Sequence, residues 1–266
     1  MEKCVRLRIW LLVALATVFS FPVLTSAGHA ESVNPAIQST AVVQDWWLQR
    51  HNAKLQQIRQ GPVDLVFIGD SITNDYEFNG GIPQYDFLAV WKRFYGDRQA
   101  VNLGFSGDTT ANVLWRLDNG EIDGITPKVA VVLIGTNNTS WGQTAENTTA
   151  GIEAVVATIH EKLPHTKVLL LGILPSGISP QKSKADAAVN MALKREYAKS
   201  AYVTFLDISS VFMKNGVLDQ SMFMDPHANP PSPALHPDAF AQAKMAEAIE
   251  PTLARLMGDK SKVGSH

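Results

Sequence analysis

Five short apolar runs, separated by longer segments, constrain the fold of this chain more than any other feature. They are rich in β-branched residues and read VDLVFIG (63–69), QAVNLGF (99–105), VAVVLIG (129–135), KVLLLGIL (167–174) and VTFLDIS (203–209). Continuous apolar runs of this length are typical of parallel strands buried on both faces. We therefore expect five strands in one parallel sheet.

The segments between these runs favour helices. We expect helices around 84–95, 109–118, 144–162, 184–200 and 238–257, with an outer helix within 40–59. Strands that alternate with helices predict an α/β fold, here a three-layer αβα sandwich around a doubly wound, parallel, five-stranded sheet. The chain has 266 residues, 45% of them hydrophobic, which is enough for one such domain.

The N-terminal region follows a different pattern. A basic start, MEKCVRLR, leads into an uncharged apolar run and then into small residues. This order predicts a cleavable signal peptide at 1–30, cut after Ala27 or Ala30, and one domain at 31–266 with its core at about 60–257. The alternative is an uncleaved membrane anchor, for which the apolar run is short. We expect a periplasmic or secreted protein with no stable membrane insertion after cleavage.

Composition narrows the chemistry of the exported chain. The single cysteine, Cys4, lies in the predicted signal peptide, so a disulfide, a thiol nucleophile or a thiolate metal site is not expected. Of 23 Lys and Arg and 25 Asp and Glu, three basic residues and one acidic residue lie in 1–30, which leaves 20 against 24 and a net charge of −4. Without a basic cluster, nucleic acid and anionic lipid are not expected partners.

Polar turns follow the first three expected strands: GDSITN, GFSGDTT and GTNN. Ligands of doubly wound sheets bind at these carboxyl ends. Ser71 can act as a nucleophile there, Gly104 can bring its N–H close to a ligand, and Asn137 is a neutral amide donor. Each has a common structural alternative, a helix cap for Ser71 and a turn for the others. Together they supply the groups that a tetrahedral acyl intermediate requires.

Four ordered blocks, GDSIT, NLGFSGDTT, GTNN and LHP, resemble the SGNH (GDSL-type) hydrolase superfamily. The run at 101–138 resembles, more narrowly, the catalytic subunits of platelet-activating-factor acetylhydrolase and their bacterial relatives. The similarity covers about residues 60–250. It implies the flavodoxin-like form of the sandwich and a hydrolase that needs no metal or organic cofactor. Family members are often homodimers, and the quoted residues leave the assembly open.

The resemblance also implies roles for single residues. Ser71 is the expected nucleophile, and its N–H, the N–H of Gly104 and the side chain of Asn137 form the expected oxyanion hole. His236, in the block LHP, is the expected general base. We also expect Asp70 to bond the local backbone.

The last block departs from the family pattern, because Pro233 stands where the family has the Asp that orients the histidine. Three interpretations stay open. In the first, PHANPPSPA is an insertion and Asp225 orients His236. In the second, a backbone carbonyl or a water does so, which leaves a Ser–His dyad. In the third, His227 is the base and His236 is structural. Asp238 is expected to cap the last helix.

For the aromatic and polar residues around these blocks we expect mainly structural roles. Trp115 is expected to pack. Trp141 and Tyr76 are candidates to shape an acyl or sugar site, with the alternative that they cover the core, as aromatic residues in loops often do. Asp108 and Thr109 are expected to cap the helix at 109–118.

These residues predict a serine esterase that forms an acyl-enzyme. The sequence shows no long apolar insert or lid-like segment, which favours acetyl or another short acyl group. Export and family favour a small-molecule or glycan ester as substrate. The alternatives are an acyltransferase or lysophospholipase with the same site, a non-catalytic glycan-binding protein, and a flavin-binding flavodoxin relative, which the four blocks disfavour.

Overall fold

A computed structural model of the protein describes residues 33–223 and 233–264. The predicted signal peptide lies outside this range, as do Asp225 and His227. No helix within the two described segments is long and apolar enough to cross a bilayer.

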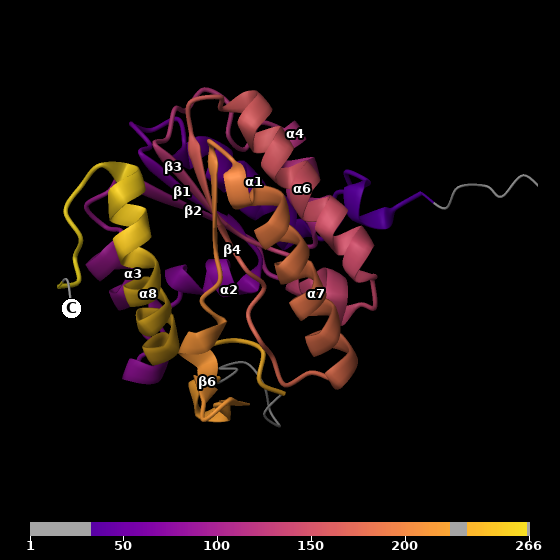
Figure 1. Ribbon diagram of the computed structural model, residues 1–266. Helices are drawn as coiled ribbons and strands as arrows, with labels where there is room; N and C mark the ends of the chain where they lie inside the picture. Colours follow the sequence, from indigo (N-terminus) through magenta and orange to yellow (C-terminus); the bar gives the residue numbers. More distant parts are fainter. Residues whose placement is uncertain (1–32, 224–232, 265–266) are drawn as a thin grey trace, which may run out of the picture. The chain divides into compact units, whose positions relative to one another are not determined.

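A five-stranded sheet lies at the centre of the domain (Figure 1). Its strands are β1 (Leu65–Gly69), β2 (Ala100–Gly104), β3 (Val129–Leu133), β4 (Lys167–Leu171) and β5 (Val203–Leu206). They lie in the order β2-β1-β3-β4-β5, and every neighbouring pair is parallel. The flavodoxin-like order and the doubly wound topology confirm the predicted fold class.

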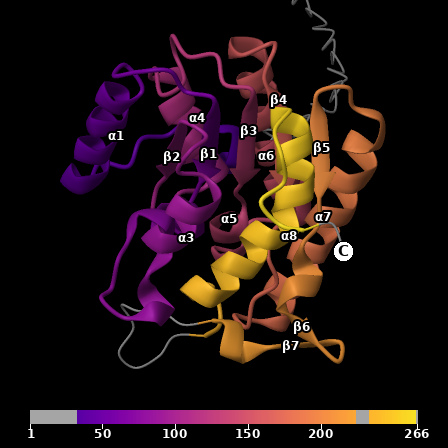
Figure 2. The same cartoon turned by 90° about the vertical axis from the view of Figure 1, so that its left-hand side faces the viewer.

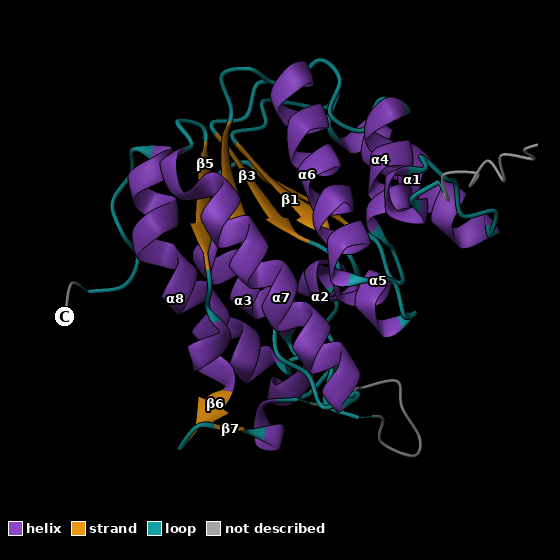
Figure 3. Ribbon diagram, turned by 45° about the vertical axis from the view of Figure 1, so that its right-hand side comes forward, coloured by secondary structure: helices purple, strands orange, loops and turns teal. Residues whose placement is uncertain are grey.

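Helices cover both faces of the sheet. The longer ones are α1 (Asp45–Gln57), α3 (Phe87–Phe94), α4 (Thr110–Asp118), α6 (Ala145–Lys162), α7 (Pro180–Glu196) and α8 (Ala239–Met257). Helices α4, α6 and α7 pack on one face and α3 and α8 on the other, while α1 lies beside α4 at the outside (Figures 2 and 3). The outer helix expected within 40–59 is therefore present.

The apolar character of the strands follows from this layering. On β1, Val66 and Ile68 join the core under α4, α6 and α7, whereas Leu65 and Phe67 join the core under α3 and α8. Successive side chains of a strand point to opposite faces, so a strand covered on both sides is apolar at every position.

The sequence pattern did not predict the shorter helices and strands. Two of them, α2 (Ser71–Asn74) and α5 (Thr136–Ser140), directly follow β1 and β3. A small antiparallel hairpin is formed by β6 (Met213–Lys214) and β7 (Val217–Leu218). Single 3-10 turns lie at Pro35–Ile37, Asp75–Glu77, Pro83–Tyr85, Tyr197–Lys199, Ser209–Phe212 and Gln220–Met222. Because α2 and α5 are about one turn long, their polar sequences show no helical periodicity.

Candidate active site

Ser71 and His236 meet beyond the carboxyl end of β1. The Oγ atom of Ser71 lies 2.8 Å from Nε2 of His236, although 165 residues separate them in the chain. Ser71 is the first residue of α2, and His236 lies two residues before Asp238, the N-cap of α8. The fold thus brings the predicted nucleophile and the predicted base into hydrogen-bond contact.

The tight turn into α2 depends on Gly69. A Cβ atom at this position would lie 2.3 Å from Oγ1 of Thr73 and 2.5 Å from the carbonyl oxygen of Leu133. A residue with a side chain would push α2 away from β1 and β3. Glycine therefore allows the chain to turn directly from the strand into the helix that begins at Ser71.

Asp70 caps this short helix. Its Oδ1 accepts a hydrogen bond from the N–H of Ile72 at 3.0 Å, which confirms that Asp70 bonds the local backbone. Burial raises the pKa of Asp70 to about 7, and the charge of Asp108 acts in the same direction, whereas the Ile72 N–H opposes the shift. The N–H of Ser71, at the first position of the helix, has no partner within the helix and is suited to a developing oxyanion.

Asn137 lies on α5 and is buried. Its Nδ2 donates to the carbonyl oxygen of Asp108 at 2.8 Å. An amide nitrogen carries two N–H bonds, of which the contact with Asp108 uses one. The next residue fixes α5 to α4, because Oδ1 of Asn138 accepts the N–H of Thr110 at 3.1 Å and its Nδ2 donates to Oγ1 of Thr110 at 2.9 Å.

Gly104 has a backbone N–H that is bonded within its own strand. Its N–H donates to Oδ1 of Asn102 at 2.8 Å, so this donor is engaged at the end of β2. A Cβ atom at Gly104 would lie 2.4 Å from the backbone nitrogen of Asn74, which shows that the glycine serves the close packing of β2 against α2. Its role in the oxyanion hole stays a prediction. Gly107, in the same loop, has a φ of +82° and open space where a Cβ would lie.

A buried arginine lies behind this loop. Arg116 is fully buried, donates from Nε to Oδ2 of Asp108 at 2.8 Å and forms an ion pair with Glu121. Its Nη1 donates to the carbonyl oxygen of Leu103 at 3.1 Å and its Nη2 to that of Gly69 at 3.3 Å. Arg116 therefore joins the carboxyl ends of β1 and β2, the two strands from which the loops of the site emerge.

The sequence reasoning missed the role of this ion pair. Thr109 caps α4 with Asn112 as expected, but the side chain of Asp108 binds Arg116 and the indole Nε1 of Trp47 instead of capping the helix. One signal was present in the sequence. Arg116 lies between Val113 and Leu117 on the apolar face of a helix, where a charged residue indicates a buried ionic partner.

The structure also tests the remaining predictions near the site. Tyr76 is 3% exposed and lies in an aromatic cluster with Phe67, Trp91 and Tyr95, so of its two expected roles the structure shows the covering of the core. Its ring is part of the core under α3, where it is surrounded by apolar side chains. Trp141, in contrast, is 66% exposed immediately after α5.

Two structural expectations are confirmed. Trp115 packs against Trp47, with ring centroids 5.3 Å apart. Asp238 caps α8, because its Oδ1 accepts the N–H of Ala241 at 2.7 Å.

The segment that carries His236 is attached through its backbone. The N–H of Gly177 donates to the carbonyl oxygen of Ala234 at 2.6 Å, and the N–H of Asp238 donates to that of Met222 at 3.0 Å. Phe223 and Pro237 form an antiparallel bridge. Asp225 and His227 lie outside the described residues, so each of the three interpretations of the base stays a prediction. Among the residues of 33–223 and 233–264, no group of three His, Cys, Asp or Glu side chains is placed to hold a metal ion.

A serine at a strand-to-helix turn, in contact with a histidine at the carboxyl edge of a doubly wound sheet, defines a class of hydrolases. Residues 67–244 match the model of the GDSL-like Lipase/Acylhydrolase family. The chain belongs to this family, which confirms the resemblance seen in its motifs, and it is a carboxylic ester hydrolase.

A relative of known sequence supports this assignment, and two solved structures share the fold. The chain is 34% identical over 215 residues to the platelet-activating factor acetylhydrolase IB subunit alpha2 of Gallus gallus, covering 80% of this chain and 86% of the relative. A GDSL-like lipase from Bacteroides thetaiotaomicron shares the fold with a TM-score of 0.57 at 18% identity, over 78% of this chain and 97% of that one. An acetylxylan esterase from Geobacillus stearothermophilus superimposes with a TM-score of 0.54 at 17% identity, over 79% and 100% of the two chains.

Proposed function

We propose that the protein hydrolyses short-chain esters, acetyl esters above all, with Ser71 as nucleophile and His236 as general base. The observation that carries the proposal is the 2.8 Å contact between Ser71 Oγ and His236 Nε2. A serine hydroxyl is a weak nucleophile at neutral pH unless a base within hydrogen-bond reach accepts its proton.

The reaction would proceed in two halves. Nε2 of His236 accepts the hydroxyl proton while Oγ of Ser71 attacks the ester carbonyl carbon and a tetrahedral oxyanion forms. The imidazolium returns this proton to the leaving alcohol, which departs and leaves an acyl-enzyme. Water, deprotonated by His236, then attacks the acyl-enzyme, and release of the carboxylic acid restores the serine hydroxyl.

The oxyanion would be held by N–H groups around the turn. The N–H of Ser71 and the second N–H of the Asn137 side chain are the donors with the strongest support. The N–H of Gly104 is bonded to Asn102, so we propose Gly107 as the donor from this loop. Its positive φ and the open space at its Cα favour a close approach by a ligand.

For the orientation of His236 we propose Asp225. Phe223 and Pro237 are paired. In sequence, Asp225 follows Phe223 by two residues and His236 directly precedes Pro237. The pairing thus supports the interpretation in which the residues between Asp225 and His236 are an insertion. A carboxylate that accepts the Nδ1–H would fix the tautomer and stabilise the imidazolium.

The proposed location is the periplasm or the extracellular space. The order of basic, apolar and small residues within 1–30 supports it. Expression of the full-length chain with a C-terminal tag, followed by fractionation and N-terminal sequencing, tests this proposal. An intact N-terminus in the cytoplasmic fraction contradicts it.

The decisive experiment measures p-nitrophenyl ester hydrolysis across acyl lengths for the wild type and for Ser71→Ala. We expect the highest kcat/KM with acetate and a loss of kcat on the order of 10⁶-fold in the variant. A folded wild type that is inactive at every acyl length contradicts the proposal. Product analysis with added sugar and lysophospholipid distinguishes hydrolysis from the acyltransferase and lysophospholipase alternatives.

A glycan ester is favoured as substrate by one side chain. Trp141 is 66% exposed, and its backbone N–H donates at 3.0 Å to the carbonyl oxygen of Asn137, so an exposed indole directly follows the helix of a proposed oxyanion donor. Such a ring offers a sugar an apolar face at low entropic cost. The solved structure with a similar fold that is named as an acetylxylan esterase adds support.

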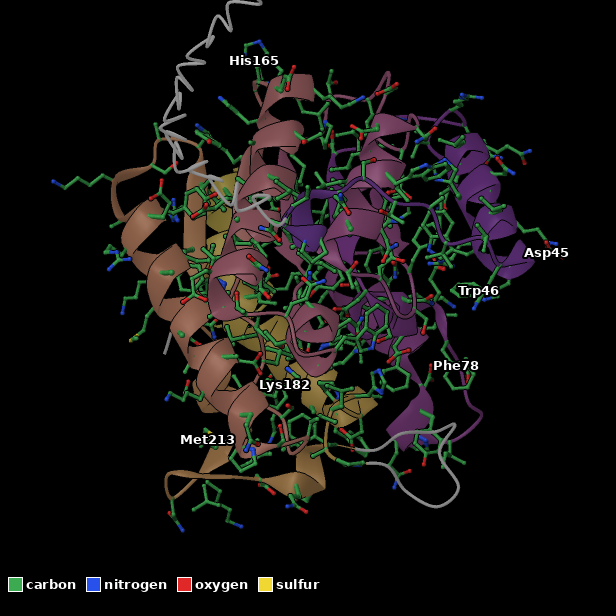
Figure 4. The ribbon with its side chains drawn as sticks, turned by 90° about the vertical axis from the view of Figure 1, so that its right-hand side faces the viewer. Asp45, Trp46, Phe78, His165, Lys182 and Met213 are labelled. Carbon is green, nitrogen blue, oxygen red and sulfur yellow. The ribbon has the colours of Figure 1, made fainter. Side chains whose placement is uncertain are left out.

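The role of Trp141 can be tested apart from the chemistry. Trp141→Ala should raise KM for acetylated xylo-oligosaccharides about 10-fold, the loss of one aromatic contact, and leave p-nitrophenyl acetate unaffected. Trp46→Ala is the matched control, because Trp46 is 43% exposed at the start of α1 (Figure 4). Equal KM values for wild type and Trp141→Ala on the oligosaccharide contradict the glycan assignment.

A further inference from the structure

Helix α1 contributes a side chain to the back of the site, although it precedes the matched region 67–244. Figures 2 and 3 show α1 outside the sheet, beside α4. Trp47 on this helix is fully buried, and its Nε1 donates to Oδ1 of Asp108 at 2.7 Å. An outer helix thus binds directly to the loop that follows β2.

Asp108 connects this contact to Asn137. Its carboxylate is held on one side by Trp47 and on the other by Nε of Arg116 at 2.8 Å. Its backbone carbonyl accepts the Nδ2 of Asn137 at 2.8 Å. Because the side chain is held on both sides, we expect the carbonyl of Asp108 to be held as well and to orient the amide of Asn137.

A second residue of α1 holds the beginning of the same loop. Nε of Arg50 donates to the carbonyl oxygen of Gly104 at 2.9 Å, and its guanidinium lies 5.0 Å from the ring centroid of Phe105. Its Nη1 forms an ion pair with Glu77 at 2.8 Å, which ties α1 to the turn after α2. The helix therefore contacts the segments that follow both β1 and β2.

We propose that α1 is a positioning element of the active site, in which Trp47 holds Asp108 so that Asp108 holds the oxyanion donor Asn137. This inference rests on the role proposed above for Asn137. Trp47 is a positioning residue and not a catalytic one, since it acts through Asp108. Its effect should therefore appear in kcat, because an oxyanion donor acts mainly in the transition state.

The charges around Asp108 give this proposal a second readout. Burial raises the pKa of Asp108 to about 6; the charge of Arg116 and the Trp47 hydrogen bond oppose the shift, and the charge of Glu121 adds to it. The charge of the Asp108 carboxylate also raises the pKa of Asp70, at the start of α2. Removing the indole N–H should raise the pKa of Asp108 further. Asp108 would then become protonated at a pH closer to neutral. Protonation of Asp108 weakens its ion pair with Arg116.

The test compares Trp47→Phe with Trp46→Phe, the same change at the neighbouring position of one helix. Phenylalanine keeps an aromatic ring but removes the donor. For Trp47→Phe we expect kcat for p-nitrophenyl acetate about 10-fold lower with little change in KM, a fraction of the loss from deleting an oxyanion donor. We also expect the acid limb of its pH–kcat profile to move to higher pH. Trp46→Phe should show neither effect, because Trp46 is exposed and donates only to Gln44 on the surface.

Arg50→Lys is a second variant should Trp47→Phe fail to fold. Its side chain is 18% exposed, and lysine keeps the charge facing Glu77 but removes the Nε donor to Gly104. We expect a few-fold loss of kcat at unchanged KM. Wild-type kcat and pH profile in each folded variant, with only a lower Tm, overturn the inference. Asn137→Ala is measured in parallel, since wild-type kcat in that variant would refute the proposed oxyanion role itself.

Discussion

The two partners of the Ser71–His236 contact are held in different ways. The serine side consists of short turns after β1, β2 and β3, joined by buried side chains such as Arg116 and Asn138. On the histidine side, residues 233–238 form no helix or strand and are attached by backbone hydrogen bonds and by the bridge between Phe223 and Pro237.

The position of the serine side is set by the sheet, whereas the position of the histidine side is set by contacts at the ends of its segment. A turn of a few residues between a strand and a helix has few conformations, and neighbouring parallel strands bring such turns to one edge. A longer segment has no such constraint and depends on what holds its ends. The serine side should therefore behave as one rigid unit, and the histidine side should depend on individual contacts.

The largest expected effect tests whether the two sides act as one unit. His236→Ala should lower kcat by about 10⁶-fold, as Ser71→Ala does, and the double variant should be no worse than either single one. Single-turnover hydrolysis of p-nitrophenyl acetate by the three variants measures this. Additive losses in the double variant would show two independent contributions and break the proposed pairing.

The next effect concerns the carboxylate on the histidine side. Asp225→Asn should lower kcat by about 10⁴-fold, because the amide favours the wrong imidazole tautomer. His227→Ala, in the same segment, is the matched control and should keep wild-type activity. Near wild-type activity of Asp225→Asn with an inactive His236→Ala favours a dyad, whereas loss of activity in His227→Ala favours that histidine as the base.

A smaller loss is expected on the serine side. Asn137→Ala removes one oxyanion donor and should lower kcat by about 10²- to 10³-fold with little change in KM. Asn119→Ala, at the exposed C-terminal end of α4, is the control and should leave kcat unchanged. A change in KM alone would assign Asn137 to ground-state binding instead.

The smallest expected effect is on stability and depends on pH. The pKa of Asp70 is raised to about 7 in the folded protein, so the folded state holds its proton more tightly than the unfolded state. Its contribution to stability is then largest below about pH 4 and is lost as the pH rises toward 7. Asp70→Asn keeps a capping oxygen without the charge, and we expect its Tm to exceed that of the wild type by about 2–4 °C at pH 8.

This gain should shrink as the pH falls. At pH 4 the wild-type carboxyl is protonated in the folded state, so the difference between the two proteins should largely disappear. Thermal unfolding followed by circular dichroism at both pH values measures it. The same Tm difference at pH 4 and pH 8 would show that the charge of Asp70 is not its cause.

The sequence predicts the serine side well for the same structural reason. Ser71 and Asn137 directly follow apolar strands, and their placement at one edge depends only on strand order. The bond between Gly104 and Asn102 was not predictable in this way, because it is made by a side chain of the strand itself. Trp47 contacts Asp108 across 61 residues of the chain, which hydrophobic periodicity does not reveal. Arg116 binds Asp108 only eight residues away, and its position on the apolar face of α4 was the one signal for this pair. The sequence left two roles open for Tyr76, because an aromatic residue in a turn can face the core as readily as a ligand.

The bridge between Phe223 and Pro237 has a consequence for the evolution and engineering of this enzyme. A closed segment becomes less stable only slowly as it lengthens, by about 0.6 kcal/mol for each doubling. Because Phe223 and Pro237 are paired, the number of residues between Asp225 and His236 can change while the bridge next to His236 stays in place. Grafting foreign sequences between Asp225 and His236, with both of these residues kept, is thus a route to new substrate ranges that leaves the reaction chemistry intact.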